Sequence, residues 1–314
     1  MALLRVLILC LCILCCHKAD ARNHTQQERI QRSEELENIL VSTEDEFDCV
    51  DIYKQSSLQH PLLKNHKIQL EPSFARETNR KDSNPDNLKG CPPGKVPIYR
   101  YKMKDQMNFS SMESGIGKFP EYLEAFPRRH FATLDTIPPH PTTYHGAAAN
   151  INICAPSVKK GQYSLAQIYA QSGPPGQLNT VQGGWGDITT GHWWLTVEDN
   201  KKSTNIGYWP KQLFTHLSNG ASMMRYGGQV GAALGMPSPP MGTGKFAEAK
   251  YLNACFFSEL QVVDSKFKFQ VAQSDDMKIY SDTPKCFDLL YPGDEGPGFG
   301  QVFLYGGPGG RCVA

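Results

Sequence analysis

The chain has 314 residues, and its 32 Lys and Arg residues against 31 Asp and Glu residues leave a formal net charge of +1. Such a balance provides no basic face for nucleic acid or for an anionic membrane, so the composition argues against both partners. The chain has 28 glycines and 22 prolines, and beyond Thr143 these residues fall between short apolar runs. This spacing predicts many short strands joined by turns, which is typical of an all-β sandwich or barrel.

The first 21 residues have the features of a secretory signal. A basic residue, Arg5, precedes the apolar run LILCLCILCC, and the small-x-small tripeptide Ala19-Asp20-Ala21 follows. We therefore expect residues 1–21 to be cleaved during secretion. The apolar run is too short to cross a membrane. The sequence predicts a secreted, extracellular protein with no membrane span.

Removal of the signal takes away four of the ten cysteines and leaves Cys49, Cys91, Cys154, Cys255, Cys286 and Cys312. An even number of cysteines in a secreted chain favours disulfides over metal or redox chemistry. If the amino-terminal half is a separable unit, Cys49 and Cys91 form its natural bridge. A bond between Cys286 and Cys312 would tie the last strands together. The two remaining cysteines are either a third pair or free thiols.

The amino-terminal half carries two N-glycosylation acceptor sequences, at Asn23 and Asn108. The segment Thr25–Val41 begins with a capping box and has apolar residues at helical spacing, so we interpret it as a solvated helix. Residues 70–95 are polar and indicate a loop. Lys95–Met103 then alternates in the manner of a strand.

A domain boundary is predicted in the segment 126–143, FPRRHFATLDTIPPHPTT. It contains the dibasic pair Arg128-Arg129 and prolines at 138, 139 and 141. Such a segment is not expected to join the interior of a sheet, and it suits an exposed connector that proteases can reach. The predicted organisation is a signal over 1–21, an amino-terminal unit over 22–135, a Pro-rich connector over 136–143 and a β domain over 144–314.

All four tryptophans lie in the stretch Gln182–Pro210. Gly191–Thr196 is typical of a strand, Asp199–Lys202 is a polar turn, and IGYWP indicates a second strand that ends at a proline. The stretch therefore predicts a Trp-rich hairpin, followed by a short helical turn near Lys211. Its aromatic side chains either fill the core of the sheet or line a ligand groove.

No common catalytic or ligand motif is present. The chain lacks His-Glu-x-x-His, Gly-x-Ser-x-Gly, P-loop and EF-hand patterns, and its nine histidines are scattered. We therefore expect neither a metal nor another cofactor.

Several longer motifs follow one another along the chain. FDCVDIYKQ, HPLLKNHKIQ and CPPGKVPI come first, then YHGAAANINICAP, GHWWL, IGYWP, YGGQV, LQVVDS, KCFDL and FLYGGPGG. In this order they resemble the neprosin family, secreted plant proteins related to glutamic peptidases. The first three are similar to the family's activation peptide and the others to its catalytic domain. The resemblance implies an antiparallel β-sandwich with a concave substrate face, preceded by a smaller propeptide-like α+β domain, and a location such as the apoplast.

The resemblance also implies a mechanism. Family members use two glutamates, one as a base that activates water and one as a protonated acid, which suits acid pH. The first lies before a Gly-Trp and the second in Trp-Gly-Gly-Glu-Val. The corresponding positions here are Gln182 and Gln229. An amide has no titratable proton, so the resemblance predicts a peptidase whose activity is lost or severely reduced.

A further departure from the family lies between Trp185 and Gly191, where family members carry a long segment containing several strands. Its absence is expected to leave strand edges exposed unless the chain repacks or oligomerises. The resemblance places the substrate groove at a set of aromatic residues: Trp185, Trp193, Trp194, Tyr208, Trp209 and Tyr226.

Three functions are therefore compatible with the sequence. The first is a secreted peptidase-like protein with little or no activity. The second is a working acid peptidase that uses other carboxylates, such as Asp187, Glu198 or Glu248. The third is a binding protein for proline-containing peptides or cell-wall glycoproteins, because proline-rich ligands dock on aromatic grooves.

Overall fold

The computed structural model describes residues 47–73, 91–92, 94–99, 128–199, 202–248, 251 and 253–312. The predicted signal, the helix predicted over Thr25–Val41 and both glycosylation acceptors lie outside these residues. No helix of the described part is long and apolar enough to cross a membrane. The chain forms two compact units, one containing residues 1–55 and 86–109 and the other residues 56–85 and 110–314. Each is described by itself.

The smaller unit is built on a two-stranded antiparallel sheet. β1 (Phe47–Asp51) pairs with β2 (Lys95–Tyr99), and the Cys49–Cys91 disulfide joins the two ends of this unit. The 3-10 helix η1 (Ile52–Lys54) follows β1, and the Asp51 carboxylate caps it by accepting a hydrogen bond of 2.8 Å from the Tyr53 N–H. The predicted strand starting at Lys95 and the predicted first disulfide are both confirmed.

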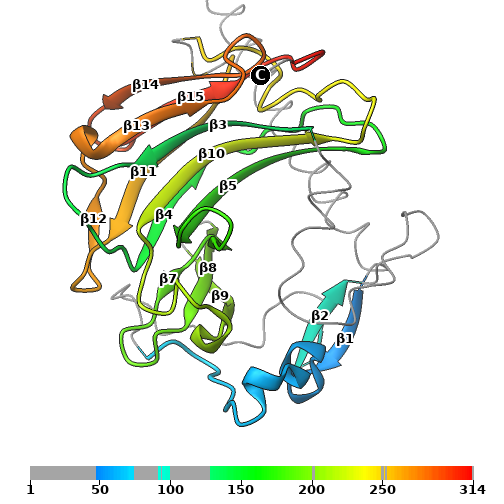
Figure 1. The fold of residues 1–314 in the computed structure, drawn as a ribbon, viewed down its shortest axis with the longest axis vertical. Coiled ribbons are helices and arrows are strands. Elements are labelled where there is room, and N and C mark those ends of the chain that lie inside the picture. The colour runs from blue at the N-terminus through cyan, green and yellow to red at the C-terminus, as the bar shows by residue number, and fades with distance from the viewer. Residues whose placement is uncertain are drawn as a thin grey trace, which may run out of the picture. The chain divides into compact units, whose positions relative to one another are not determined.

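The larger unit contains two antiparallel sheets. The first has the order β13-β3-β10-β5-β6, and Figure 1 shows β3, β10 and β5 side by side in a curved layer. Its strands are β3 (Arg128–Thr136), β5 (Gln162–Ser172), β6 (Asn179–Gln182), β10 (Met223–Ala232) and β13 (Met277–Ser281).

The second sheet has the order β14-β15-β11-β4-β7-β8-β9, with β12 paired to β11. Its strands are β4 (Gly146–Ile151), β7 (Trp185–Gly186), β8 (Trp193–Asp199), β9 (Lys202–Trp209), β11 (Cys255–Val263), β12 (Phe269–Val271), β14 (Asp288–Asp294) and β15 (Gln301–Gly306). The described part of the unit also contains short 3-10 helices: η2 (Ser56–Gln59), η3 (Pro61–Leu63), η5 (Lys211–Leu213) and η6 (Ser274–Asp276). The all-β, antiparallel class is confirmed, and so are the Trp-rich hairpin β8–β9 and the helical turn after it.

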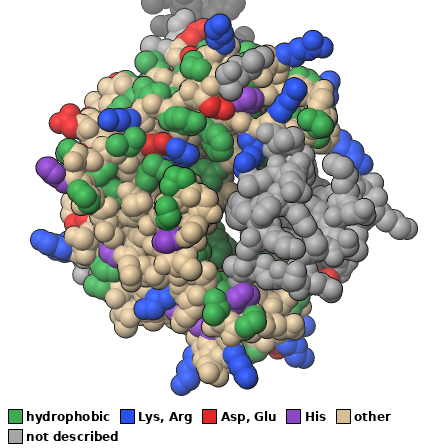
Figure 2. All heavy atoms as spheres, in the orientation of Figure 1, with side chains coloured by type: hydrophobic (Ala, Val, Ile, Leu, Met, Phe, Trp, Pro, Cys, Tyr) green, Lys and Arg blue, Asp and Glu red, His purple; other side chains and the backbone are tan. Residues whose placement is uncertain are grey.

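The core lies between the two sheets and consists of alternate residues of their strands. Large, fully buried side chains come from the first sheet at Leu134, Met224 and Tyr226 and from the second at Phe257 and Phe303. The last two rings stack with their centroids 4.8 Å apart. On the face drawn in Figure 2, Lys and Arg side chains lie mostly around the periphery, while hydrophobic side chains gather toward the centre.

Two disulfides stabilise the larger unit, Cys154–Cys255 and Cys286–Cys312. The second was predicted from the sequence. The first resolves the alternative that the sequence left open, because the strand β11, which starts at Cys255, pairs with β4, which ends just before Cys154.

The prediction that the segment 126–143 stays out of a sheet interior is wrong for residues 128–136. They form β3, which lies between β13 and β10. The physical reason is an alternating pattern in RRHFATLDT that turns the buried Ala132 and Leu134 toward the core. The prolines at 138, 139 and 141 come only after the strand has ended. Residues 137–143 form no strand.

A short loop between β7 and β8 closes the junction at which the resemblance implies a longer segment. The Gly191 N–H donates to the Asp187 carbonyl at 2.7 Å, and the Asp187 N–H donates to the His192 carbonyl at 2.9 Å. Trp185 and Trp194 are therefore direct partners in the sheet. β6 is left as an edge strand of the first sheet.

The position of β3 leads to a stability prediction. Leu134→Ala should lower the free energy of unfolding by roughly 2–5 kcal/mol, because it removes a fully buried side chain from between two sheets. Ile279→Ala, at the residue paired with Leu134 in β13 but 53% exposed, should change it by less than about 1 kcal/mol. Urea unfolding of both variants measures the difference, and equal losses would show that β3 is not a core strand.

Candidate functional site

The sheet register places Gln229 on the side of the first sheet that faces away from the core. In β10, Tyr226 and Val230 point into the core, so the alternate residues Arg225 and Gln229 point away from it. Side chains on paired residues of the neighbouring strands share that side. We call this surface the Gln229 face, formed by Phe131, Thr133, Asp135, Tyr163, Leu165, Gln167, Tyr169, Gln182, Arg225, Gln229 and Tyr280.

The Gln229 side chain is held by neighbours on β5. Its Oε1 accepts hydrogen bonds from Gln167 Nε2, at 2.7 Å, and from the Tyr169 hydroxyl. Its Nε2 donates to the Tyr163 hydroxyl at 2.6 Å. Only 6% of the residue is exposed. The amide is therefore fixed in one orientation, and it is not presented to solvent.

An ion pair lies next to Gln229 on the same face. Arg225 donates to both carboxylate oxygens of Asp135, with Nε at 2.8 Å and Nη2 at 2.6 Å. The guanidinium lies over the rings of Phe131 and Tyr280, 5.9 and 5.2 Å from their centroids. Burial lowers the pKa of Arg225, but the hydrogen bonds and charge of Asp135 outweigh this and raise it overall. The pair is a fixed and largely buried charge pair on this face.

Gln182 occupies the last position of the edge strand β6, and its side chain is exposed. Its partner in register is Tyr169, the residue whose hydroxyl reaches Gln229. Gly184, two residues further, has φ +107°, and a Cβ there would lie 2.5 Å from the Trp194 carbonyl oxygen. Only glycine fits where the chain crosses to the second sheet. The two glutamines thus lie on one side of one sheet, with β5 between them.

The aromatic groove expected from the sequence is wrong for three of its six residues. Trp193, Trp194 and Tyr226 are 1%, 2% and 0% exposed, so they cannot touch a ligand. Trp193 belongs to the core, where its Nε1 donates to the Leu217 carbonyl at 3.0 Å. Trp194 lies on the other side of β8, in register between its partners on β7 and β9. The other three, Trp185, Tyr208 and Trp209, are half-buried. The hairpin is mainly structural.

The carboxylates proposed as alternative catalytic groups lie elsewhere. Asp187 is fully buried, and its oxygens accept hydrogen bonds from the backbone N–H groups of Thr189 and Thr190, at 2.9 Å each, and from Ser73 and Gln69. Burial raises its pKa, but these hydrogen bonds together lower it. Glu198 is exposed on β8 of the second sheet, and Glu248 is exposed in a loop. None of the three lies on the Gln229 face.

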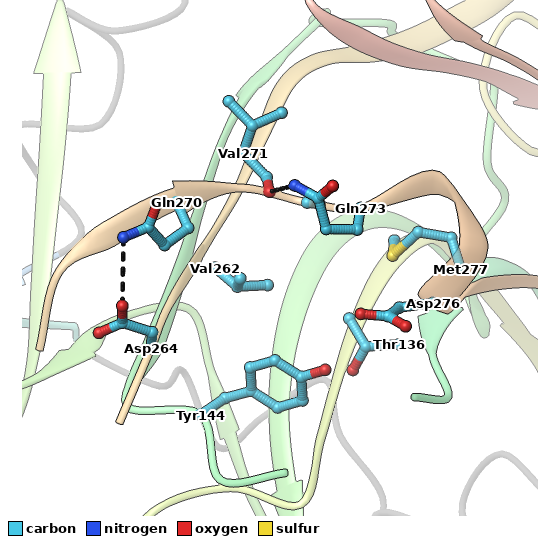
Figure 3. Close-up of a pocket in the computed structure, with 10 residues that line it drawn as sticks. Thr136, Tyr144, Val262, Asp264, Gln270, Val271, Gln273, Asp276 and Met277 are labelled. Carbon is cyan, nitrogen blue, oxygen red and sulfur yellow. Dashed lines mark hydrogen bonds between the residues drawn. The ribbon is translucent and has the colours of Figure 1, made fainter. Parts of the chain in front are cut away.

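No group of His, Cys, Asp and Glu residues among the described residues could hold a metal ion. A cavity of about 260 Å³ lies apart from the Gln229 face, at Tyr144, Val262, Asp264 and Asp276. In Figure 3 the Tyr144 hydroxyl points toward Thr136 and Asp276. Burial raises the pKa of this phenol.

Comparison with protein families gives two matches. Residues 39–137 match the neprosin activation peptide, and residues 185–308 match the neprosin domain. The chain belongs to the neprosin family. The neprosin match includes Gln229 and begins just after Gln182. The activation-peptide match runs to the end of β3.

Part of the neprosin activation-peptide region is built into the larger unit. Its residue His66 lies 2.7 Å from the Tyr208 hydroxyl through Nε2, and the Gln69 N–H donates to the same hydroxyl at 2.9 Å. Ser73 and Gln69 also bind the Asp187 carboxylate. No local sequence pattern indicates these contacts, because they join residues more than a hundred positions apart.

Two histidines meet at this contact. His192 stacks on Tyr208 with centroids 5.0 Å apart, and His66 lies 5.2 Å from His192. Burial first, and then the neighbouring His66 and Lys211, lower the pKa of His192 to about 4, although the charge of Asp187 opposes the shift. Burial also lowers the pKa of His66. At neutral pH the His192 imidazole is therefore neutral.

A pH dependence follows from these shifts. Between pH 6.5 and about 4 the unfolded chain binds more protons at His192 than the folded chain does, so stability should fall as the pH falls through this window. His192→Gln should flatten this part of the profile, measured as melting temperature against pH. His140→Gln, in the exposed connector, is the control and should leave the profile unchanged. A His192→Gln profile as steep as that of the parent would contradict the assignment.

Proposed function

We propose that this chain is a secreted, peptidase-like member of the neprosin family whose proteolytic activity is lost or severely reduced. The observation that carries the proposal is the environment of Gln229. A buried amide, bound by Gln167, Tyr169 and Tyr163, occupies a position at which the family resemblance implies a catalytic glutamate. The other such position, Gln182, is also an amide.

The chemistry explains the loss. Hydrolysis of a peptide bond by two carboxylates needs one to take a proton from water and the other to give a proton to the amide. Two neighbouring carboxyls share a proton, which splits their titrations and provides both forms at acid pH. Glutamine keeps the shape of glutamate but cannot take up or release a proton. General acid or base catalysis contributes roughly 10²–10⁴-fold per group.

Other carboxylates are poor substitutes. Among the described residues of the Gln229 face, the only carboxylate is Asp135, and Arg225 holds both of its oxygens. A bidentate ion pair occupies both carboxylate oxygens and holds the group in one orientation, away from a role toward water. The Asp187 carboxylate already accepts hydrogen bonds from its own loop and from Ser73 and Gln69. The alternative of a peptidase that uses other acids therefore has little support.

Binding without cleavage is the second candidate, and the exposed part of the Gln229 face favours it. Leu165 on β5 and Tyr280 on β13 are 38% and 44% exposed, and Gln182 is exposed on the edge strand β6 of the same sheet. Exposed apolar, aromatic and amide side chains on one face suit a proline-containing peptide or a cell-wall glycoprotein. The signal over 1–21 and the disulfides support a role outside the cell, such as in the apoplast. No cofactor is required by this proposal.

Restoring the carboxylates tests the proposal. The double variant Gln182→Glu, Gln229→Glu should cleave a proline-containing peptide at acid pH at least about 100-fold faster than the parent chain, because it regains both an acid and a base. Each single variant should gain less than about 10-fold, since half of the proton transfer is left to solvent. The measurement is the release of new amino termini.

A control variant separates the catalytic effect of the restored carboxylates from the effect of added negative charge. Gln171→Glu adds the same charge to the outward-facing side of β5, within the same sheet, and should produce no gain. A folded double variant that is no faster than the Gln171→Glu control would show that the missing carboxylates are not the primary defect.

A further inference from the structure

The strand β3 belongs to the activation-peptide match and also to the interior of the first sheet. The match covers residues 39–137, and β3 covers Arg128–Thr136. β3 forms eight register pairs with β10 and five with β13. In the described part of the first sheet, β13 has no other neighbour. Removal of β3 would therefore open the sheet and detach β13 from it.

Side-chain contacts fix β3 as firmly as its backbone pairing does. Ala132, Thr133 and Leu134 are each 0% exposed. Asp135 forms the bidentate ion pair with Arg225, and the Thr136 hydroxyl accepts a hydrogen bond of 2.9 Å from the Met224 N–H. Burying apolar side chains and a charge pair together gives a strand that is costly to withdraw.

The opposite end of β3 is held by a second carboxylate. Asp282, just beyond β13, accepts a hydrogen bond of 2.8 Å from the Phe131 N–H and lies 2.9 Å from His130 Nδ1. Phe131 is also the register partner of Gln229. The strand therefore supports the Gln229 face itself.

The chain that follows β3 is open to proteases. Residues 137–143 carry three prolines and form no strand, and all but Pro138 are exposed, with Ile137 at 45%. Tyr144, which comes next, is buried at 5%. Exposed, irregular segments between packed elements are preferred sites of cleavage. The connector therefore contains peptide bonds that a protease can reach, between the two family matches.

No disulfide found among the described residues crosses this connector. Cys49–Cys91 lies on its amino-terminal side, and Cys154–Cys255 and Cys286–Cys312 lie on its carboxyl-terminal side. Once the connector is cut, the two chains are held by non-covalent contacts. Besides β3, the described part of the amino-terminal chain contributes Leu63, which is 3% exposed, and the contacts of His66, Gln69 and Ser73.

We propose that hydrolysis of one peptide bond in the connector 137–143 produces a stable two-chain protein, in which the amino-terminal chain continues to supply β3. Water adds its hydroxyl to the carbonyl carbon and its proton to the released nitrogen, and no other bond changes. The activation-peptide region is then a permanent subunit of the sandwich. A cut at this connector does not release it.

The test uses the full chain with residues 138–142 replaced by the recognition sequence of a specific protease. After cleavage at neutral pH, denaturing gels without reductant should show two fragments. Size-exclusion chromatography under native conditions should show both fragments in one peak at the position of the uncut protein. Separation of the amino-terminal fragment from a carboxyl-terminal fragment that keeps its circular dichroism spectrum would overturn the proposal. Resistance of the native protein to the protease would also overturn it.

A second variant tests whether β3 is the main contact. Asp135→Asn weakens the pair with Arg225, and in the uncut chain β3 stays covalently attached, so the fold is retained. In the cut protein the variant should dissociate at least about tenfold faster than the parent, because a broken buried ion pair acts mainly on the dissociation rate. Gln69→Ala, at the other contact, should change the rate less. The opposite order would place the principal contact at residues 61–73 instead of at β3.

Discussion

The antiparallel register of β3, β10 and β5 is the constraint on which the rest of the molecule depends. Side chains alternate along β10, so one register sends Tyr226 into the core and Gln229 to the opposite side. A shift of one residue would exchange the two sets and would bury a polar network where the aromatic core now lies. The strand pairing that stabilises the sandwich therefore also determines which side chains lie on its outer face.

On that face, hydrogen bonding determines the chemistry. Gln229 uses its carbonyl oxygen and its amide nitrogen toward three side chains of β5, and Asp135 uses both oxygens toward Arg225. Satisfied polar groups in a buried network are rigid and are costly to rearrange. The amide of Gln229 and the carboxylate of Asp135 are both occupied by these partners, so neither is available to move a proton. This is the structural basis for proposing a protein that binds more readily than it cleaves.

Much of the fold could be predicted from residue patterns. The Trp-rich hairpin, the β class, the family and the bridges Cys49–Cys91 and Cys286–Cys312 follow from turn residues, cysteine number and motif order. β3 is hard to predict because three prolines follow it closely, and the alternation of the buried Ala132 and Leu134 is the main signal of the strand. The prediction of an aromatic groove was partly wrong because the sequence alone does not show which face of a sheet is buried against other parts of the protein. The Tyr163, Gln167 and Tyr169 side chains could have been found from their period-two spacing in QYSLAQIYAQS, whereas the contact of His66 with Tyr208 has no local signal.

The central claim is that the natural chain cannot carry out acid–base hydrolysis of a peptide bond. The most direct measurement is to incubate the purified, secreted protein with a proline-containing peptide across acid pH and to count new amino termini by mass spectrometry while binding is followed by calorimetry. The account predicts no termini above those of a peptide-only control, whether or not heat of binding is detected. Catalytic release of termini by the unmodified protein, with repeated turnover per molecule, would contradict it.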